Sequence, residues 1–89
     1  MNLYMMHVGF YDHSIGVGIY ESHINYFIAA SDPKDAKTKV LALEEFQDRN
    51  MHIDGIKEIS EVDGYEVRLV QSSEAKDGKV FSYDESSDL

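Results

Sequence analysis

The chain has no cysteine among its 89 residues. Without thiols it can form neither a disulfide framework nor a zinc site with thiolate ligands, and this composition suits a reducing compartment. Basic residues are also few, eight lysines and arginines against seventeen acidic residues, which gives a formal net charge of -9. Binding to nucleic acid or to an anionic membrane surface depends on clustered Lys and Arg side chains. We therefore expect neither of these partners.

Long apolar runs are absent as well. No run approaches the ~20 residues that span a bilayer, and the segment after Met1 has neither the basic region nor the long apolar region of a signal peptide. We therefore expect a cytoplasmic protein. Hydrophobic residues make up 43% of the chain, enough for the core of one small domain. We assign residues 1–72 to a single α+β domain and 73–89 to a polar, acidic extension, in which 79–83 is a candidate short edge strand.

Two strands are predicted in the first thirty residues. Residues 2–10 alternate two sets of largely apolar side chains, as in a strand that is covered on both faces. Residues 20–30 alternate between an apolar face and a mixed one. The segment 11–18 between them carries the Asp, Ser and Gly residues that are typical of turns. This pattern predicts an antiparallel hairpin with a long, irregular loop.

Asp32 and Pro33 predict the start of a helix, because an Asp side chain caps free amide groups and proline is favoured at the first helical position. Apolar residues then recur at spacings of four, three and three, which gives one helical stripe: Ala36, Val40, Leu43 and Phe46. We predict that the helix ends near Arg49 and Asn50, where the asparagine suits a left-handed cap.

The segments on either side of residues 62–64 are predicted to form a second hairpin. A two-residue turn at Asp63-Gly64 would place polar Ser60 opposite Val67. A three-residue loop over 62–64, with its glycine in the left-handed conformation, instead places Ile59 opposite Val67. Because cross-strand pairs stabilise a sheet, we predict the three-residue loop.

The predicted fold class is therefore α+β, with elements in the order ββαββ. We expect a four-stranded, mostly antiparallel sheet with one helix packed on one face. Asp54-Gly55 interrupts the start of the third strand and is a candidate β-bulge.

The four histidines are the residues best suited to binding a metal ion or to catalysis. His7 and His23, on the first two strands, can meet on one face of the sheet, and His52 with Asp54 lies at the entrance of the third strand. Imidazole and carboxylate together suit zinc or another divalent ion. The chain contains no short ligand spacing such as His-x-x-x-His, however. We therefore expect no bound metal and no cofactor, and retain metal binding as the alternative.

Several short segments match one known pattern: Asn2-Leu3-Tyr4-Met5, Tyr20-Glu21-Ser22-His23 with Phe27, His52-Ile53-Asp54, Val62-Asp63-Gly64-Tyr65 and Val67-Arg68-Leu69. Together, over roughly residues 2–71, they resemble the bacterial family called domain of unknown function 1543. The chain differs from that family at Gly9-Phe10, where a paired glycine is usual, and at Phe46, where a tryptophan is usual. The resemblance implies a small cytoplasmic domain, here in a single copy, that pairs with itself and has no established activity. The polar positions that match the motif are our candidate binding residues: Glu21, His23, His52 and Asp54.

We expect a binding or assembly domain that acts through self-association rather than an enzyme. The first two strands carry apolar side chains on both faces, and one helix covers only one of them. Soluble monomers rarely expose an apolar patch of that size, and two-fold symmetry is the commonest way to bury it, so we expect a homodimer. The alternative is a small enzyme or metal-binding domain that uses His23 and His52.

Overall fold

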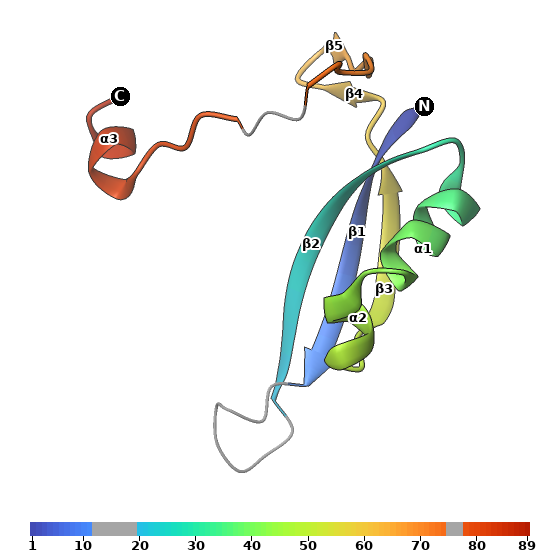
Figure 1. Cartoon of the computed structure of the whole chain (residues 1–89). Helices are drawn as coiled ribbons and strands as arrows, with labels where there is room; N and C mark the ends of the chain where they lie inside the picture. Colours follow the sequence, from blue (N-terminus) through green and yellow to red (C-terminus); the bar gives the residue numbers. More distant parts are fainter. Residues whose placement is uncertain (12–19, 75–77) are drawn as a thin grey trace.

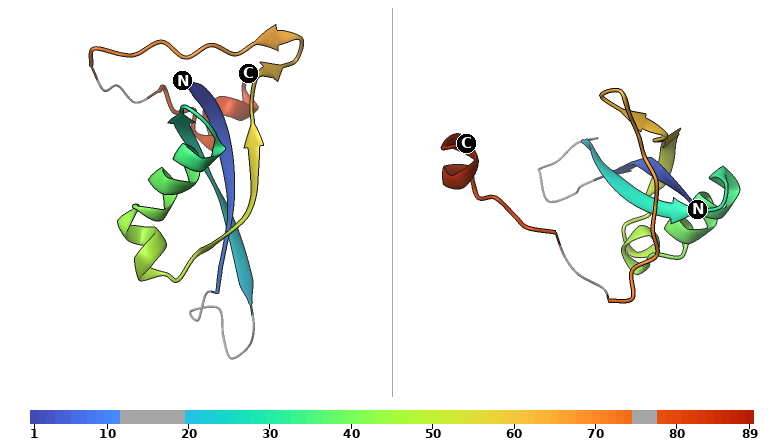
Figure 2. Two further views of the ribbon diagram at one scale, coloured as in Figure 1. Left: turned by 90° about the vertical axis from the view of Figure 1, so that its right-hand side faces the viewer. Right: turned by 90° about the horizontal axis from the view of Figure 1, so that it is seen from above.

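The computed structural model describes residues 1–11, 20–74 and 78–89 of the chain. Its main part is a three-stranded antiparallel sheet in the order β2-β1-β3, and the strands are β1 (Asn2–Tyr11), β2 (Glu21–Ala30) and β3 (His52–Glu58). Helices α1 (Pro33–Leu41) and α2 (Glu44–Asp48) lie on one face of this sheet (Figure 1, Figure 2). The two predicted N-terminal strands and their antiparallel pairing are confirmed. The predicted turn over residues 11–18 lies, beyond Tyr11, outside the described residues.

The central strand β1 has two different faces, because successive side chains of a strand point to opposite sides. Tyr4, Met6 and Val8 are buried beneath the helices. The side chains between them, Met5 and His7, point to the other side of the sheet, and Gly9 has no side chain on either side. We call that other side the open face, since no helix of the described residues covers it.

The core lies between β1 and the helices. In the part of the chain that the structure describes, eight buried apolar residues form it: Tyr4, Met6, Val8, Ala30, Ala36, Val40, Phe46 and Met51. Three residues of the predicted helical stripe are therefore fully buried, and the fourth, Leu43, is partly buried against the same cluster. The predicted inward face of the helical region is confirmed.

The helix begins where the sequence predicts. The Asp32 carboxylate accepts a hydrogen bond from the Asp35 backbone amide at 2.7 Å, and Pro33 is the first helical residue. In return the Asp35 carboxylate accepts the backbone amide of Ser31 at 3.0 Å, which lowers the pKa of Asp35. These two bonds satisfy amide groups that have no partner inside the helix.

Asp32→Ala should therefore reduce the free energy of unfolding by about 1 kcal/mol, the usual effect of removing an N-terminal cap. Chemical denaturation measures this change. Asp48→Ala is the control, because Asp48 is the last residue of α2 and caps no amide in the described structure. Equal losses in the two variants would show that the Asp32 cap contributes nothing specific.

The single helix that we predicted is in fact two helices. The chain leaves helical geometry at Leu43, which is extended with φ -66° and ψ 133°, and α2 then begins at Glu44. The spacing of apolar residues does not predict this break, because no glycine or proline lies between the two helices. The predicted end is correct: Asn50 has a left-handed φ of 48°, and the amide of Met51 closes the turn on the carbonyl of Phe46 at 3.1 Å.

The predicted four-stranded sheet is wrong in its last strand. β4 (Glu61–Val62) and β5 (Tyr65–Glu66) form a separate two-stranded hairpin, and no strand follows in residues 67–72. The predicted three-residue loop is also wrong, since Val62 pairs with Tyr65 across a two-residue turn. Asp63 and Gly64 both have positive φ, 54° and 81°, which is the requirement of the two-residue turn that suits a hairpin. The hairpin is exposed, so the polarity of facing residues does not fix its register.

The C-terminal extension contains a helix in place of the expected strand. Residues 78–82 have no regular structure, and α3 (Tyr83–Ser87) follows, so the edge strand over 79–83 is not formed. Figures 1 and 2 show α3 standing away from the sheet. Within residues 1–11, 20–74 and 78–89, no helix combines the length and the apolar character that crossing a membrane requires.

Candidate metal centre

The four candidate residues come together on the open face. Glu21 and His23 are two residues apart on β2, and His52 and Asp54 are two residues apart on β3. The strand between them, β1, pairs Gly9 with His23 on one side and with His52 on the other. The two imidazoles therefore stand on either side of a residue that has no side chain.

A bulge in β3 adds Asp54 to this group. Val8 pairs with Ile53 and His7 pairs with Gly55, so Asp54 is an extra residue without a partner of its own on β1. The predicted β-bulge at Asp54-Gly55 is thereby confirmed. Bulges redirect side chains, and the Asp54 carboxylate lies between the imidazoles of His23 and His52.

The donor atoms of the four residues lie close together. His52 Nε2 is 2.8 Å from Glu21 Oε1 and 3.2 Å from Asp54 Oδ1. His23 Nε2 is 2.9 Å from Asp54 Oδ2 and 3.4 Å from Glu21 Oε1. Each imidazole thus faces both carboxylates, and each carboxylate faces both imidazoles. We call these four residues the His–carboxylate cluster.

The cluster is partly open to solvent, since its side chains are 32–41% exposed. An ionised carboxylate only accepts hydrogen bonds. The Nε2–H group of each imidazole therefore donates to a carboxylate, from His23 to Asp54 and from His52 to Glu21. The nitrogen lone pairs become available to an ion when these protons leave, as metal binding to imidazole requires.

Gly9 gives the cluster its space. A β-carbon at this position would lie 2.5–2.6 Å from Glu21 Oε1, Asp54 Oδ2 and His52 Nε2. Any other residue would therefore push these donor atoms aside. The same short distances show that the point above Gly9 is nearly equidistant from donor atoms of three cluster residues.

His7 and Asn25 support the cluster from one side. The rings of His7 and His23 are stacked, with centroids 4.8 Å apart and planes 2° apart, as expected for two histidines on one sheet face. His7 Nδ1 donates to the side-chain oxygen of Asn25 at 2.7 Å, which leaves Nε2 of His7 as the unprotonated nitrogen at neutral charge. Within the described part of the chain, two groups of three residues offer ligand atoms within 4.8 Å of one another and share Asp54: Glu21, His52 and Asp54 form one, and His7, His23 and Asp54 form the other. Because the nitrogen lone pairs lie in the ring plane, those of two stacked imidazoles lie in separate parallel planes and do not meet at one ion. We therefore assign His7 a supporting position.

The sequence predicts the four residues of the His–carboxylate cluster but not the glycine beneath them. Glu21, His23, His52 and Asp54 were named as candidates, and the structure brings all four together. Gly9 was not. The available signal is a lone glycine inside a strand of large side chains, which often marks a close approach of other groups.

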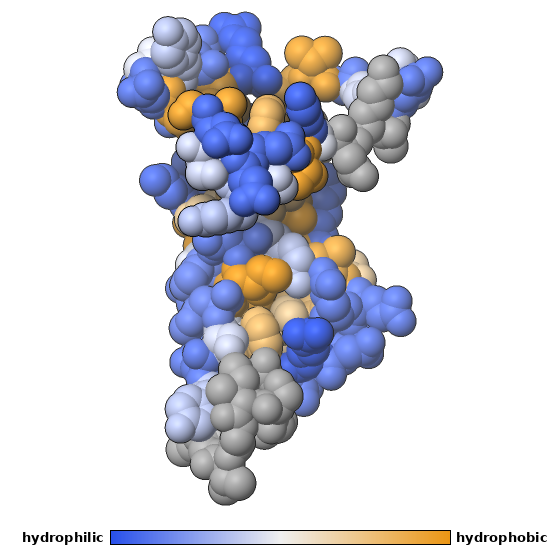
Figure 3. Space-filling model, turned by 90° about the vertical axis from the view of Figure 1, so that its left-hand side faces the viewer, coloured by the Kyte–Doolittle hydropathy of each residue, from blue (hydrophilic) through white to orange (hydrophobic). Residues whose placement is uncertain are grey.

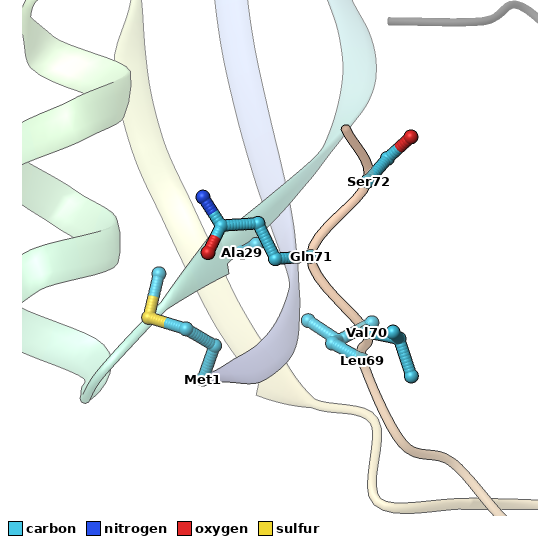
Figure 4. Close-up of a pocket in the computed structure, with 6 residues that line it drawn as sticks. All are labelled: Met1, Ala29, Leu69, Val70, Gln71 and Ser72. Atoms are coloured by element: carbon cyan, nitrogen blue, oxygen red, sulfur yellow. The ribbon is translucent and has the colours of Figure 1, made fainter. Parts of the chain in front are cut away.

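A second concave region lies at the other end of β2 (Figure 4). Its lining is mainly apolar and includes no titratable side chain: Met1, Ala29, Leu69, Val70, Gln71 and Ser72. Its polar side chains are limited to the Gln71 amide and the Ser72 hydroxyl, and it has no charged group or metal-ligating set. The His–carboxylate cluster remains the candidate functional site.

The chain matches no protein-family model, no curated protein and no solved structure. The resemblance to the family called domain of unknown function 1543 therefore stays a prediction. The function has to be argued from the geometry of the cluster.

Proposed function

We propose that this domain binds a divalent transition-metal ion through Glu21, His23, His52 and Asp54. One observation carries the proposal: each of two imidazole nitrogens lies within 3.4 Å of an oxygen of both carboxylates, above a residue without a side chain. The sequence alone favours assembly over metal binding, because no short ligand spacing is present. Because all four residues come together from two separate strands, we now place metal binding ahead of assembly.

The donor set indicates which ions to expect. Calcium and magnesium are bound through oxygen atoms, whereas imidazole nitrogen suits zinc and its first-row neighbours. A tetrahedral ion with bonds of about 2.0–2.1 Å holds its ligand atoms ~3.3 Å apart. The four nitrogen–oxygen distances in the cluster, 2.8–3.4 Å, are close to that spacing. Glu21, His52 and Asp54 offer ligand atoms within 4.8 Å of one another. His23 Nε2 lies 2.9 Å from the Asp54 carboxylate and 3.4 Å from the Glu21 carboxylate, so His23 is placed to complete the set.

The exposed position of the cluster allows further chemistry. Structural zinc sites are closed by four protein ligands, whereas catalytic sites keep one position for water or substrate. The cluster offers four ligands at the surface, so a water molecule can reach a bound ion as a fifth ligand from the solvent side. We propose metal binding alone, and we still expect that the domain is not an enzyme.

Calorimetric titration of chelator-treated protein with zinc, and the visible absorption of the cobalt complex, test the proposal. We expect one ion per chain. Asp54→Asn should weaken binding by at least roughly 10–100-fold, the effect of losing even an outer-shell partner. Asp63→Asn is the matched control, because it removes the same charge at the exposed β4–β5 turn, where asparagine also adopts positive φ. Absence of zinc binding, or equal binding by both variants, would refute the proposal.

The structure also favours a second candidate function, assembly through self-association. Apolar side chains outside the core are exposed, among them Phe27 at 63% and Tyr65 at 75%. An isolated chain with this much unpacked surface is suited to binding another protein. We propose that the other protein is a second copy.

A further inference from the structure

The outer edge of β2 has the properties of a pairing surface. β2 is ten residues long and lies at the end of the sheet, where it pairs with β1 on one side only. Figure 3 views the molecule from the side on which β2 lies in Figure 1, and apolar side chains, coloured orange, are exposed at mid-height. Two apolar residues of β2 are among the exposed ones, Ile24 at 41% and Phe27 at 63%.

The hydrogen-bond pattern shows which backbone groups face outward. The amide of Ile59 donates to the carbonyl of Leu3 at 2.8 Å, so the odd-numbered residues of β1 bond toward β3 and the even-numbered ones toward β2. In an antiparallel pair, facing residues either exchange both bonds or neither. On β2 the even-numbered residues therefore bond to β1. The backbone groups of the odd-numbered residues point away from the sheet: Glu21, His23, Asn25, Phe27 and Ala29.

One of these outward groups already has a partner. The carbonyl of Ala29 accepts a hydrogen bond from Lys39 Nζ at 2.8 Å. Among the described residues, no other outward backbone group of β2 is bonded. The free part of the edge therefore runs from Glu21 to Phe27, and its midpoint is Ile24.

Nothing in β2 protects this edge. Proteins usually block an edge strand with charged residues, proline or a bulge. From residue 22 to residue 30, β2 contains no Asp, Glu, Lys, Arg or proline and has a regular register. The other edge strand, β3, contains Asp54, Lys57 and Glu58 and carries the bulge. The two edges of one sheet thus differ in the features that prevent pairing.

We propose that β2 pairs antiparallel with β2 of a second copy, which joins the two sheets into one of six strands. Antiparallel pairing of a strand with itself is two-fold symmetric, so the same surface serves both copies. With the two-fold axis at Ile24, His23 faces Asn25 of the other copy and Glu21 faces Phe27. All outward backbone groups from Glu21 to Phe27 are then bonded, and the Lys39 bond to Ala29 is kept.

The side chains agree with this register. Ile24 meets its counterpart at a position without backbone bonds, where facing side chains of an antiparallel pair are closest. Its 41% exposed side chain becomes covered there. The two Glu21 carboxylates, the acidic groups of β2, lie at opposite ends of the ladder and do not face each other. No acidic side chain of β2 therefore faces another across the contact.

This inference rests on the second candidate function, self-association, and is independent of metal binding. The ladder uses backbone groups, so the His–carboxylate cluster stays exposed on the open face. Light scattering should give twice the chain mass of 10.1 kDa for the protein at micromolar concentration. Ile24→Lys, which places two like charges together at the axis, should reduce the mass to that of the monomer.

Ile56→Lys is the matched control. Ile56 lies on the same face of the opposite edge strand and is 40% exposed, so the lysine adds the same charge in a similar setting. That variant should remain dimeric. Because the chain has no cysteine, Ile24→Cys should also form a symmetric intermolecular disulfide on oxidation, and Ile56→Cys should not.

The outcomes separate the two proposals. A monomeric protein would overturn both self-association and the pairing of β2. A dimer that survives Ile24→Lys and gives no disulfide with Ile24→Cys would overturn the pairing of β2 alone, and self-association would stand. A dimer lost in Ile56→Lys but kept in Ile24→Lys would place the contact on β3.

Discussion

Gly9→Ala should abolish stoichiometric binding of zinc, with affinity reduced ~100-fold or more, because loss of even an outer-shell partner costs 10–100-fold. The added methyl group would lie 2.5–2.6 Å from donor atoms of Glu21, His52 and Asp54. All three must move away from the point that they surround. These atoms are at the ends of flexible, partly exposed side chains, so we expect the fold to survive while the donor geometry is lost.

Gly55→Ala is the control for this substitution. Gly55 lies on β3 opposite His7, and a β-carbon there would have no heavy atom within 4 Å. Zinc titration of both variants, with thermal melting of the ion-free proteins, separates a local effect from unfolding. Zinc affinity of Gly9→Ala equal to that of Gly55→Ala would show that the ion does not use the space above Gly9.

Part of the cluster follows from the sequence, because residues two apart on a strand share a face. That rule places Glu21 beside His23, and the pairing of the first two strands places His7 beside His23. It cannot place His52. The position of His52 depends on β3 lying against β1, on the side away from β2, and strand order in a sheet is set by how the whole chain packs.

The errors in the fold have a common physical origin. We assumed that residues after Gly64 pair with the third strand, because Ile59 and Val67 are both apolar. In the structure β3 pairs with β1 on one side only, and the hairpin that follows it forms only two pairs of residues. Side-chain polarity selects a register where one face is buried, and the β4–β5 hairpin is exposed on both faces. There the turn residues, Asp63 and Gly64, decide the register.

Metal binding and self-association make different demands on β2, which is why both can use it. The cluster takes the side chains of Glu21 and His23, whereas the pairing takes backbone groups on the outer edge. A strand that is free of charge along most of its length serves the pairing. The charges needed for an ion then come from Glu21 at the strand's first position and from Asp54 on β3.

Met6→Ala should cause a large loss of stability, about 2–5 kcal/mol in the free energy of unfolding. Met6 is fully buried at the centre of the middle strand, between Tyr26 on β2 and Ile56 on β3. Within residues 1–11, 20–74 and 78–89 the core has only eight buried residues, so few neighbours can shift into the cavity. For a domain with a total stability of ~4–13 kcal/mol, the melting temperature should fall by roughly 10–30 °C.

Met5→Ala is the matched control, since it removes the same side chain from the next residue of the same strand. Met5 points to the open face and is only partly buried, so its loss should cost about 1 kcal/mol, part of the value for a fully buried side chain. Denaturant unfolding of both variants gives the two energies. A loss for Met5→Ala as large as that for Met6→Ala would mean that the open face is packed as tightly as the face beneath the helices. The face that carries the His–carboxylate cluster would then be a second core, and an ion could not reach it from solvent.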